Sequence, residues 1–141
     1  MLASCSPNTT SSENTHPYSQ CDNRVDSQNR SDYEAIPVAE IAKTNPNQTI
    51  VQDPKATVLD AFGLSELQES QQQDIVVSCP EADLVIVTLT KTGLLDDSVA
   101  GVRDRAEFTS HPEGWELIWV GRQQKCYSGR GNTDWSTELC L

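Results

Sequence analysis

Hydrophobic and polar residues alternate with the two-residue period of β-strands through much of the second half of the chain. Within residues 101–109, the apolar side chains of Val102 and Phe108 fall on one side of such a strand. Arg103 and Arg105 alternate with them and fall on the other side. Short turns join consecutive segments of this kind, which predicts an antiparallel meander. The expected strands span residues 75–79, 84–90, 101–109, 115–120 and 123–127.

Two helical patterns precede these strands. Asp53 can cap a helix with its carboxylate, and Pro54 suits the first helical position because it has no amide hydrogen to satisfy. With the apolar residues that follow, this pattern predicts a helix over residues 54–62. A weaker pattern near residues 32–43 is interrupted by Pro37, which predicts a short or broken helix there.

Together these elements predict a single α+β domain over residues 49–141. One or two short helices are expected to pack on a four- to five-stranded antiparallel meander. A helix followed by a curved meander is similar to the arrangement in cystatin-like and NTF2-like folds.

The segment before the domain is polar. Residues 6–31 are dominated by Ser, Asn, Thr, Gln and Asp. Such a sequence buries too little apolar surface to offset a backbone entropy cost of about 1–2 kcal/mol per residue. We therefore expect residues 6–48 to form a disordered polar tether that carries only the weak helix near residues 32–43.

Residues 1–5 contain Leu2-Ala3-Ser4-Cys5, which resembles the lipobox of bacterial lipoproteins. The resemblance implies cleavage before Cys5 and a lipid on its sulfur. It implies an exported protein anchored to the membrane on the periplasmic side. The basic and apolar regions of a signal peptide do not precede the motif in this sequence, so a cytoplasmic protein is the alternative.

The net charge of the chain bears on whether it binds nucleic acids or membranes. The 141 residues include 21 Asp and Glu against 10 Lys and Arg, for a net charge of −11. This acidity argues against nucleic-acid binding, which needs a basic surface to displace counterions. No run approaches the length of about 18 apolar residues that a membrane-spanning helix needs. Membrane contact is therefore expected only through the lipid anchor.

The five cysteines do not have the spacing of a zinc ribbon or a thioredoxin-type site. Cys126 and Cys140 bracket a glycine-containing segment, and a disulfide between them would stabilise the fold by roughly 3 kcal/mol. Two free thiols are the alternative for this pair. Cys21 and Cys79 form a possible second pair, although Cys79 would also suit a buried thiol.

A longer resemblance covers about the last third of the chain. Its residues are Gly93-Leu94-Leu95-Asp96-Asp97-Ser98-Val99-Ala100-Gly101-Val102-Arg103, Trp115-Glu116-Leu117-Ile118-Trp119-Val120-Gly121, Cys126-Tyr127-Ser128-Gly129-Arg130-Gly131, Asp134-Trp135-Ser136 and Cys140. This part of the chain resembles an uncharacterised family of small exported bacterial proteins of cyanobacterial type. The resemblance implies export and a shared fold, and it brings no activity with it.

No group of residues suggests catalysis. The two histidines, His16 and His111, have neither a nucleophile nor a metal-like companion nearby in the sequence. Asp96-Asp97-Ser98 lacks the alternating ligands of a calcium loop and reads as a solvated turn. We therefore predict a non-enzymatic protein with no catalytic residue, no cofactor and no metal site.

The C-terminal part combines basic and aromatic residues. Residues 101–141 hold five basic and six acidic residues, for a net charge of −1, whereas residues 1–100 hold five and 15, for −10. Stacking of arginine on tryptophan within the fold is the simpler interpretation. The functional alternative is a recognition face, because Trp and Arg are common in binding hot spots. The candidate surface comprises Arg103, Arg105, Trp115, Trp119, Arg122, Arg130 and Trp135.

The leading hypothesis is that this sheet face binds a protein or a cell-envelope component. A small-ligand pocket inside a helix-wrapped sheet, with or without catalytic activity, is the first alternative. An intracellular structural subunit is the second alternative.

Overall fold

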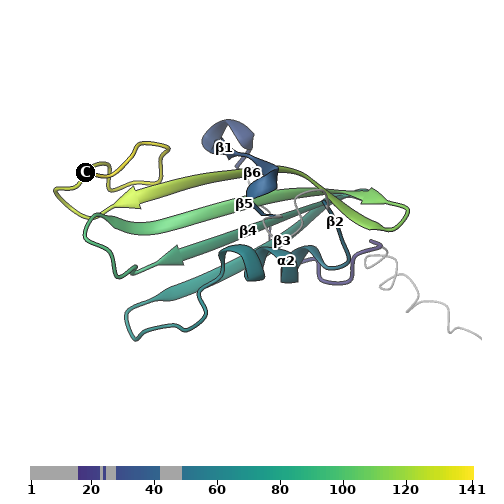
Figure 1. Cartoon of the computed structure of the whole chain (residues 1–141), viewed down its shortest axis with the longest axis horizontal. Coiled ribbons are helices and arrows are strands. Elements are labelled where there is room, and N and C mark those ends of the chain that lie inside the picture. The colour runs from purple at the N-terminus through teal and green to yellow at the C-terminus, as the bar shows by residue number, and fades with distance from the viewer. Residues whose placement is uncertain (1–15, 23, 25–27, 42–48) are drawn as a thin grey trace, which may run out of the picture.

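The computed structural model describes residues 16–22, 24, 28–41 and 49–141. Cys5, its lipobox-like motif and part of the expected tether lie outside these described residues. The described chain forms one antiparallel sheet of six strands with one α-helix, which confirms the α+β class (Figure 1). The sequence predicts four to five strands, so the sheet has at least one strand more than expected. Its strands are β1 (Glu34–Ile36), β2 (Ile50–Val51), β3 (Gln72–Glu81), β4 (Leu84–Thr92), β5 (Val99–His111) and β6 (Gly114–Cys126).

The meander predicted from the sequence forms the body of this sheet. The strand order is β1-β6-β5-β4-β3, and β2 also pairs with β6. β4 is an interior strand between β5 and β3, and it is covered on both faces as its aliphatic sequence predicts, because Val85 to Leu89 are all buried. The two additional strands, β1 and β2, are only three and two residues long. They are too short to leave a periodic pattern in the sequence.

The predicted break within residues 115–127 is wrong, because β6 runs through Gly121 without a turn. A Cβ atom at Gly121 would lie 2.2 Å from a ring carbon of Trp119 and 2.8 Å from the Cβ of Tyr33. Gly121 therefore gives space for two aromatic side chains within a continuous strand.

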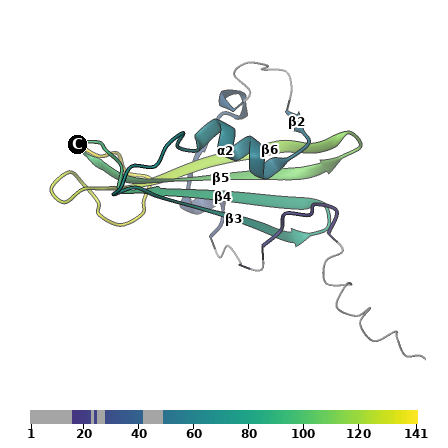
Figure 2. The ribbon, with the colours of Figure 1, turned by 90° about the horizontal axis from the view of Figure 1, so that it is seen from below.

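The helix α2 spans Pro54–Phe62, as the sequence predicts. The carboxylate of Asp53 accepts a hydrogen bond from the amide of Ala56, so the expected cap is formed. Val58 is fully buried and packs in the same hydrophobic core as Val87, Leu89 and Phe108. Figure 2 shows α2 on one side of the sheet. We call this side the α2 face.

The part of the expected tether that the structure describes is packed on the sheet, so the tether prediction is wrong for residues 16–22 and 28–41. Tyr18 lies in the hydrophobic core and is 7% exposed. Cys21 forms a disulfide with Cys79 in β3. The strand β1 pairs with β6, with Ala35 opposite Gly121. The core therefore draws on residues on both sides of the predicted domain start at residue 49.

The weak helix expected near residues 32–43 is replaced by two 3-10 turns, η2 (Arg30–Asp32) and η3 (Val38–Glu40), with β1 between them. Asn29 and Asp32 form the capping box of η2 by exchanging side-chain and backbone hydrogen bonds. Pro37 stands at the N-cap of η3 and prevents a continuous helix. Residues 42–43 lie outside the described residues.

Candidate binding cleft at the edge of the sheet

The outer edge of β6 is covered by three separate pieces of chain. β2 pairs with Trp115 and Glu116, and β1 pairs with Val120 to Arg122. Further along, Gln124 and Ser136 exchange two backbone hydrogen bonds of 2.8 Å. Covering the edge in this way blocks uncontrolled pairing with other strands. It also brings β1 and the C-terminal segment to neighbouring positions on β6.

The C-terminal segment, residues 127–141, is held in place by its own contacts; we call it the tail. The predicted disulfide between Cys126 and Cys140 is present and closes the tail on the end of β6 (Figure 1). Within the loop, the amide of Cys126 donates to the carbonyl of Asn132 at 2.8 Å. The amide of Leu141 donates to the carbonyl of Arg130 at 2.7 Å. The tail is therefore a fixed wall beside β6.

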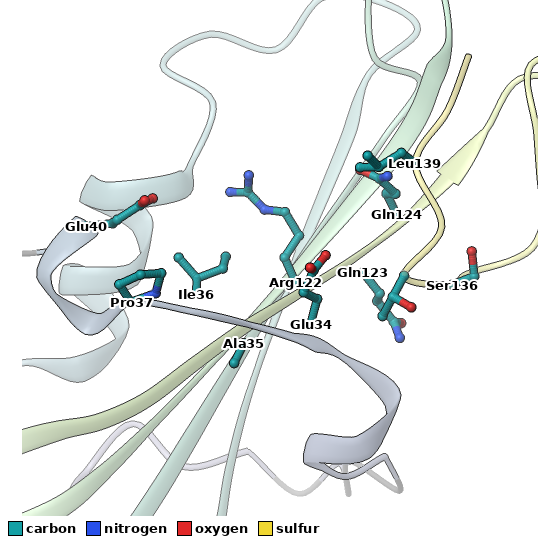
Figure 3. A pocket seen from close by; sticks show the side chains of 11 residues that line it. Glu34, Ala35, Ile36, Pro37, Glu40, Arg122, Gln123, Gln124, Ser136 and Leu139 are labelled. Carbon is teal, nitrogen blue, oxygen red and sulfur yellow. The ribbon is translucent and has the colours of Figure 1, made fainter.

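A cleft of about 310 Å3 opens where β1, η3, β6 and the tail meet (Figure 3). β6 supplies its floor, and the other three segments supply its walls. The volume lies at the lower end of the range of small-ligand sites, roughly 300–1,000 Å3. Its lining residues are Glu34, Ala35, Ile36, Pro37, Glu40, Arg122, Gln123, Gln124, Ser136, Thr137 and Leu139.

Arg122 is the cationic group of the cleft floor. Its Nε–H donates to Oδ1 of Asp104 at 2.7 Å, and its guanidinium carbon lies 5.4 Å from the ring centroid of Phe62. The Arg122 side chain is 41% exposed, whereas that of Asp104 is 1% exposed. A buried carboxylate thus orients a partly exposed guanidinium, which is a suitable arrangement for recognising an anion.

Lys91 completes an ion network that extends from Arg122 across the α2 face of the sheet. Its Nζ lies 3.5 Å from Oδ2 of Asp104 and donates to the carbonyl of Phe62 at 2.7 Å. Burial lowers the pKa of Lys91 from its usual value, and the nearby Asp104 carboxylate opposes this shift. The network holds the cleft floor to the end of α2.

The seven residues of the predicted binding surface do not share one face. Trp115 is buried in the core on the α2 face, where its ring packs edge-to-face with Tyr18 at 6.1 Å. Arg122 also lies on the α2 face, through its contact with Phe62. Arg130 is exposed in the tail. The expectation of one continuous Arg/Trp surface is therefore wrong, because alternation along β6 sends its side chains to opposite sides of the sheet.

The opposite side of the sheet carries Arg103, Arg105 and Trp119, but it is covered by residues 28–36 of the same chain; we call these residues the strap. Nη1 of Arg105 donates to the carbonyl of Gln28 at 2.9 Å. Arg30 of the strap donates to Glu107 at 2.7 and 2.9 Å. The sequence suggested that this sheet face binds another molecule. In the structure the strap of the same chain covers it.

Aromatic rings hold the same strap. Tyr33 is 6% exposed and packs edge-to-face on Trp119, with ring centroids 6.3 Å apart. The guanidinium carbon of Arg30 lies 5.2 Å from the centroid of Trp119. Stacking within the fold, the simpler interpretation of the Arg and Trp residues, describes these contacts.

Trp135 anchors the tail by the same chemistry. The guanidinium carbon of Arg103 lies 4.1 Å from the Trp135 centroid, and Nζ of Lys125 lies 5.2 Å from it. A ring carbon of Trp135 would be 2.9 Å from a Cβ atom at Gly101, so the ring lies directly on the β5 backbone. Trp135 therefore packs on the side of the sheet that the strap also covers.

Two other groups considered for chemistry have structural roles. Oδ2 of Asp96 accepts hydrogen bonds from the amides of Ser98 and Val99 at 2.9 and 2.8 Å, and these bonds lower the Asp96 pKa. This geometry is that of a turn. His16, Cys21 and Cys79 place potential metal-ligand atoms within 4.8 Å of one another, but the two sulfurs form a disulfide. In this oxidised state the group offers a metal only the imidazole.

The chain matches no protein-family model, no curated protein and no solved structure. Among the described residues, no helix has both the length and the apolar character needed to cross a bilayer.

Sequence reasoning identified only one residue of the cleft, Arg122. It missed Glu34 and Glu40 because both fall in a segment that the composition assigns to a tether. It missed Ser136 and Leu139 because their pairing with β6 depends on how the tail folds back. The capping box that Asn29 and Asp32 form is a local sign of order in the strap that sequence reasoning did not use.

Proposed function

We propose that this protein is a non-enzymatic, exported binding domain that recognises a protein or a cell-envelope component. A lipid on Cys5 tethers it to the membrane on the periplasmic side. The edge cleft, rather than a broad Arg/Trp face, is the binding site. The observation that carries this proposal is the cleft of about 310 Å3 with Arg122 on its floor.

The two disulfides support the exported location. Cys21–Cys79 and Cys126–Cys140 both form in the structure, and disulfides persist in oxidising compartments outside the cytoplasm. One of them fixes a wall of the cleft. Binding would therefore be sensitive to reduction, as is common for small exported domains.

We also propose that the chain belongs to the cyanobacterial-type family of small exported proteins. It rests on the sequence resemblance of the last third of the chain. The cystatin-like or NTF2-like arrangement is proposed on the order of elements, because α2 precedes β3 to β6 and lies across one face of their sheet.

The binding proposal is tested by replacing Thr137 in the cleft with a photo-crosslinking amino acid in the native cell. A matched position is Glu113, in the exposed turn between β5 and β6 at the opposite end of β6. We expect a discrete crosslinked product from position 137 and none from position 113. Identical patterns at both positions, or no product at position 137, would contradict a binding role for the cleft.

Lipid anchoring is tested by mass spectrometry of the N-terminal peptide of the protein isolated from cells. Lipid tethering predicts a chain that begins at Cys5 and carries the added mass of acyl groups. An intact, unmodified Met1 would refute export by this route and would favour the intracellular structural subunit.

A small-ligand pocket is the second candidate function, and the volume of the same cleft favours it. It differs from the sequence-based alternative in its position, since it lies at the sheet edge and not between helix and sheet. The space under α2 is filled by Val58, Leu89 and Phe108, each fully buried.

A further inference from the structure

We infer that the cleft recognises a basic amino acid with a free carboxylate, either alone or as the last residue of a peptide. The inference deepens the proposed function and rests on it. Three features of the cleft carry it: a fixed guanidinium on the floor, two carboxylates on one wall, and apolar side chains between and opposite them.

The floor supplies a site for the ligand carboxylate. Because Asp104 engages the Nε–H of Arg122, the plane of the guanidinium is set before a ligand arrives. Figure 3 shows the guanidinium between Glu40 on one side and Gln124 and Leu139 on the other. A carboxylate binds a planar guanidinium through two parallel hydrogen bonds, which gives both affinity and orientation.

The wall formed by β1 and η3 supplies carboxylates for a cation, Glu40 from η3 and Glu34 from the β1 position opposite Arg122 (Figure 3). Glu34 and Glu40 are both exposed and both line the cleft. The ion network that includes Arg122 contains two positive side chains, Lys91 and Arg122, and one negative side chain, Asp104. With the two wall glutamates, the group has three carboxylates and two cations, for a net charge of −1. The wall glutamates therefore favour the side-chain cation of the ligand, while its carboxylate is directed to Arg122.

The remaining lining suits an alkyl stem between the two charges. Ile36 and Pro37 lie on the same wall as the glutamates, and Leu139 lies on the opposite wall. Leu139 is 80% exposed although it lines the cleft, so a ligand that packs against it removes apolar surface from water. Lysine and arginine combine an apolar stem with a terminal cation. The cleft volume of about 310 Å3 is small and suits one residue more than a long peptide.

The test is a titration of the full chain, with both disulfides intact, followed by nuclear magnetic resonance. The probes are free lysine and the dipeptide Ala-Lys. The signals are the amides of Ser136 and Thr137 and the side-chain amide of Gln124, all of which line the cleft. We expect saturable shifts of these signals with at least one probe, and comparison of the two probes separates a free amino acid from a peptide end.

Two ligand analogues test the two charges separately. Norleucine keeps the alkyl stem and the carboxylate but lacks the terminal cation, and lysinamide keeps the cation but lacks the carboxylate. We expect each to bind at least about threefold more weakly than lysine, as the loss of one partly exposed charged contact implies. Equal affinity for lysine and norleucine, or tighter binding of glutamate, would overturn the inference.

Glu40→Gln is the protein variant for the same test, and Glu113→Gln is its matched control. Both remove one exposed carboxylate, and only Glu40 lines the cleft. We expect Glu40→Gln to weaken lysine binding by about two- to fivefold and Glu113→Gln to leave it unchanged. An equal effect of the two variants would show general charge attraction and would overturn the inference.

The outcomes separate this inference from the proposed function. If the cleft signals do not respond to lysine or Ala-Lys but position 137 still crosslinks a partner, the ligand class is wrong and the binding function stands. If neither experiment gives a response at the cleft, both proposals fail.

Discussion

At the residue scale, two polar side chains in the interior, Tyr18 and Asp104, have hydrogen-bond or charged partners. The hydroxyl of Tyr18 donates to Asp53 and accepts from the amide of Lys55 at 3.1 Å, at the start of α2. Asp104, fully buried, is paired with Lys91 and Arg122. Each group is expected to cost stability when its partner is removed, since a buried polar group without a partner is unfavourable.

Replacement of Tyr18 by Phe should lower the free energy of unfolding by about 1 kcal/mol at neutral pH, through loss of the hydrogen bond to Asp53. Burial, followed by the hydrogen bond to Asp53, raises the pKa of Tyr18 above its ordinary value of 10.0. The unfolded chain therefore loses this proton at a lower pH than the folded chain. The stabilisation by Tyr18 is fully present below pH 10 and declines as the pH rises further.

Urea unfolding between pH 8 and pH 11 measures this dependence. Tyr127→Phe is the control, because it also removes a tyrosine hydrogen bond, here to the carbonyl of Leu94, from an exposed side chain. The alkaline decline should be shallower in Tyr18→Phe and unchanged in Tyr127→Phe. An unchanged decline in Tyr18→Phe would show that the buried phenol does not contribute to it.

Replacement of Asp104 by Asn should lower the free energy of unfolding by about 3 kcal/mol, because it leaves Lys91 buried without its counter-charge. The double variant Lys91→Met with Asp104→Leu removes both charges and should cost less than the single variant. Chemical denaturation of the three proteins measures the difference. A double variant less stable than Asp104→Asn would mean that the ion pair is worth more than an apolar replacement.

At the element scale, short segments gain their structure from the strands that they contact. The predictable elements, α2 and β3 to β6, have capping residues or alternation in their own sequence. β1 and β2 have neither, since a three-residue strand such as β1 exists only because the edge of β6 offers hydrogen-bond partners. The same reason explains the missed cleft, whose walls come from β1, η3 and the tail. Arg122 alone was identified, as one of the basic residues of the C-terminal part, although the sequence placed it in a break between two strands and not within β6.

The two disulfides should contribute unequally to stability. Cys21–Cys79 joins residues separated by 58 positions, and Cys126–Cys140 joins residues separated by 14. The loss of entropy in the unfolded chain grows with the loop, which gives about 4 kcal/mol for the first and about 3 kcal/mol for the second. Paired Cys→Ser variants, compared by thermal unfolding without reductant, should show the larger loss for Cys21 and Cys79. The reverse order would indicate that the tail loop contributes packing beyond its cross-link.

At the scale of the whole molecule, the described part of the expected tether belongs to the same folded unit as the meander. Tyr18 packs in the core on the α2 face, and the strap covers the opposite side of the sheet. The charged side chains on that side, Arg103, Arg105 and Glu107, therefore have their hydrogen-bond partners within the chain itself. The charged face is an internal contact surface, and the open surface for a ligand moves to the sheet edge.

A chain that begins at Thr49 should be markedly less stable than the full chain, because it lacks Tyr18, Tyr33 and β1. Cys79→Ser in the short chain and Cys21→Ser with Cys79→Ser in the full chain remove the effect of the disulfide from the comparison. We expect the short chain to lose at least about 3 kcal/mol, as the removal of two buried aromatic side chains implies. Equal thermal midpoints would show that the residues before Thr49 do not stabilise the fold and act as a tether.

Local features of the sequence predict the α+β class, the extent of α2, the strands β3 to β5 and a Cys126–Cys140 disulfide, because capping, alternation and close cysteine spacing need no distant partner. The structure was needed to choose between a Cys21–Cys79 disulfide and a buried thiol at Cys79. Only the tertiary structure decided that residues 28–36 form the strap and that β1 and the tail lie next to each other on β6. These contacts join residues up to about ninety positions apart, as between Asp32 and Gln123, and they use single polar groups without a periodic pattern. Polar composition shows that a segment cannot form its own core, but whether it docks depends on the partners that a folded sheet presents.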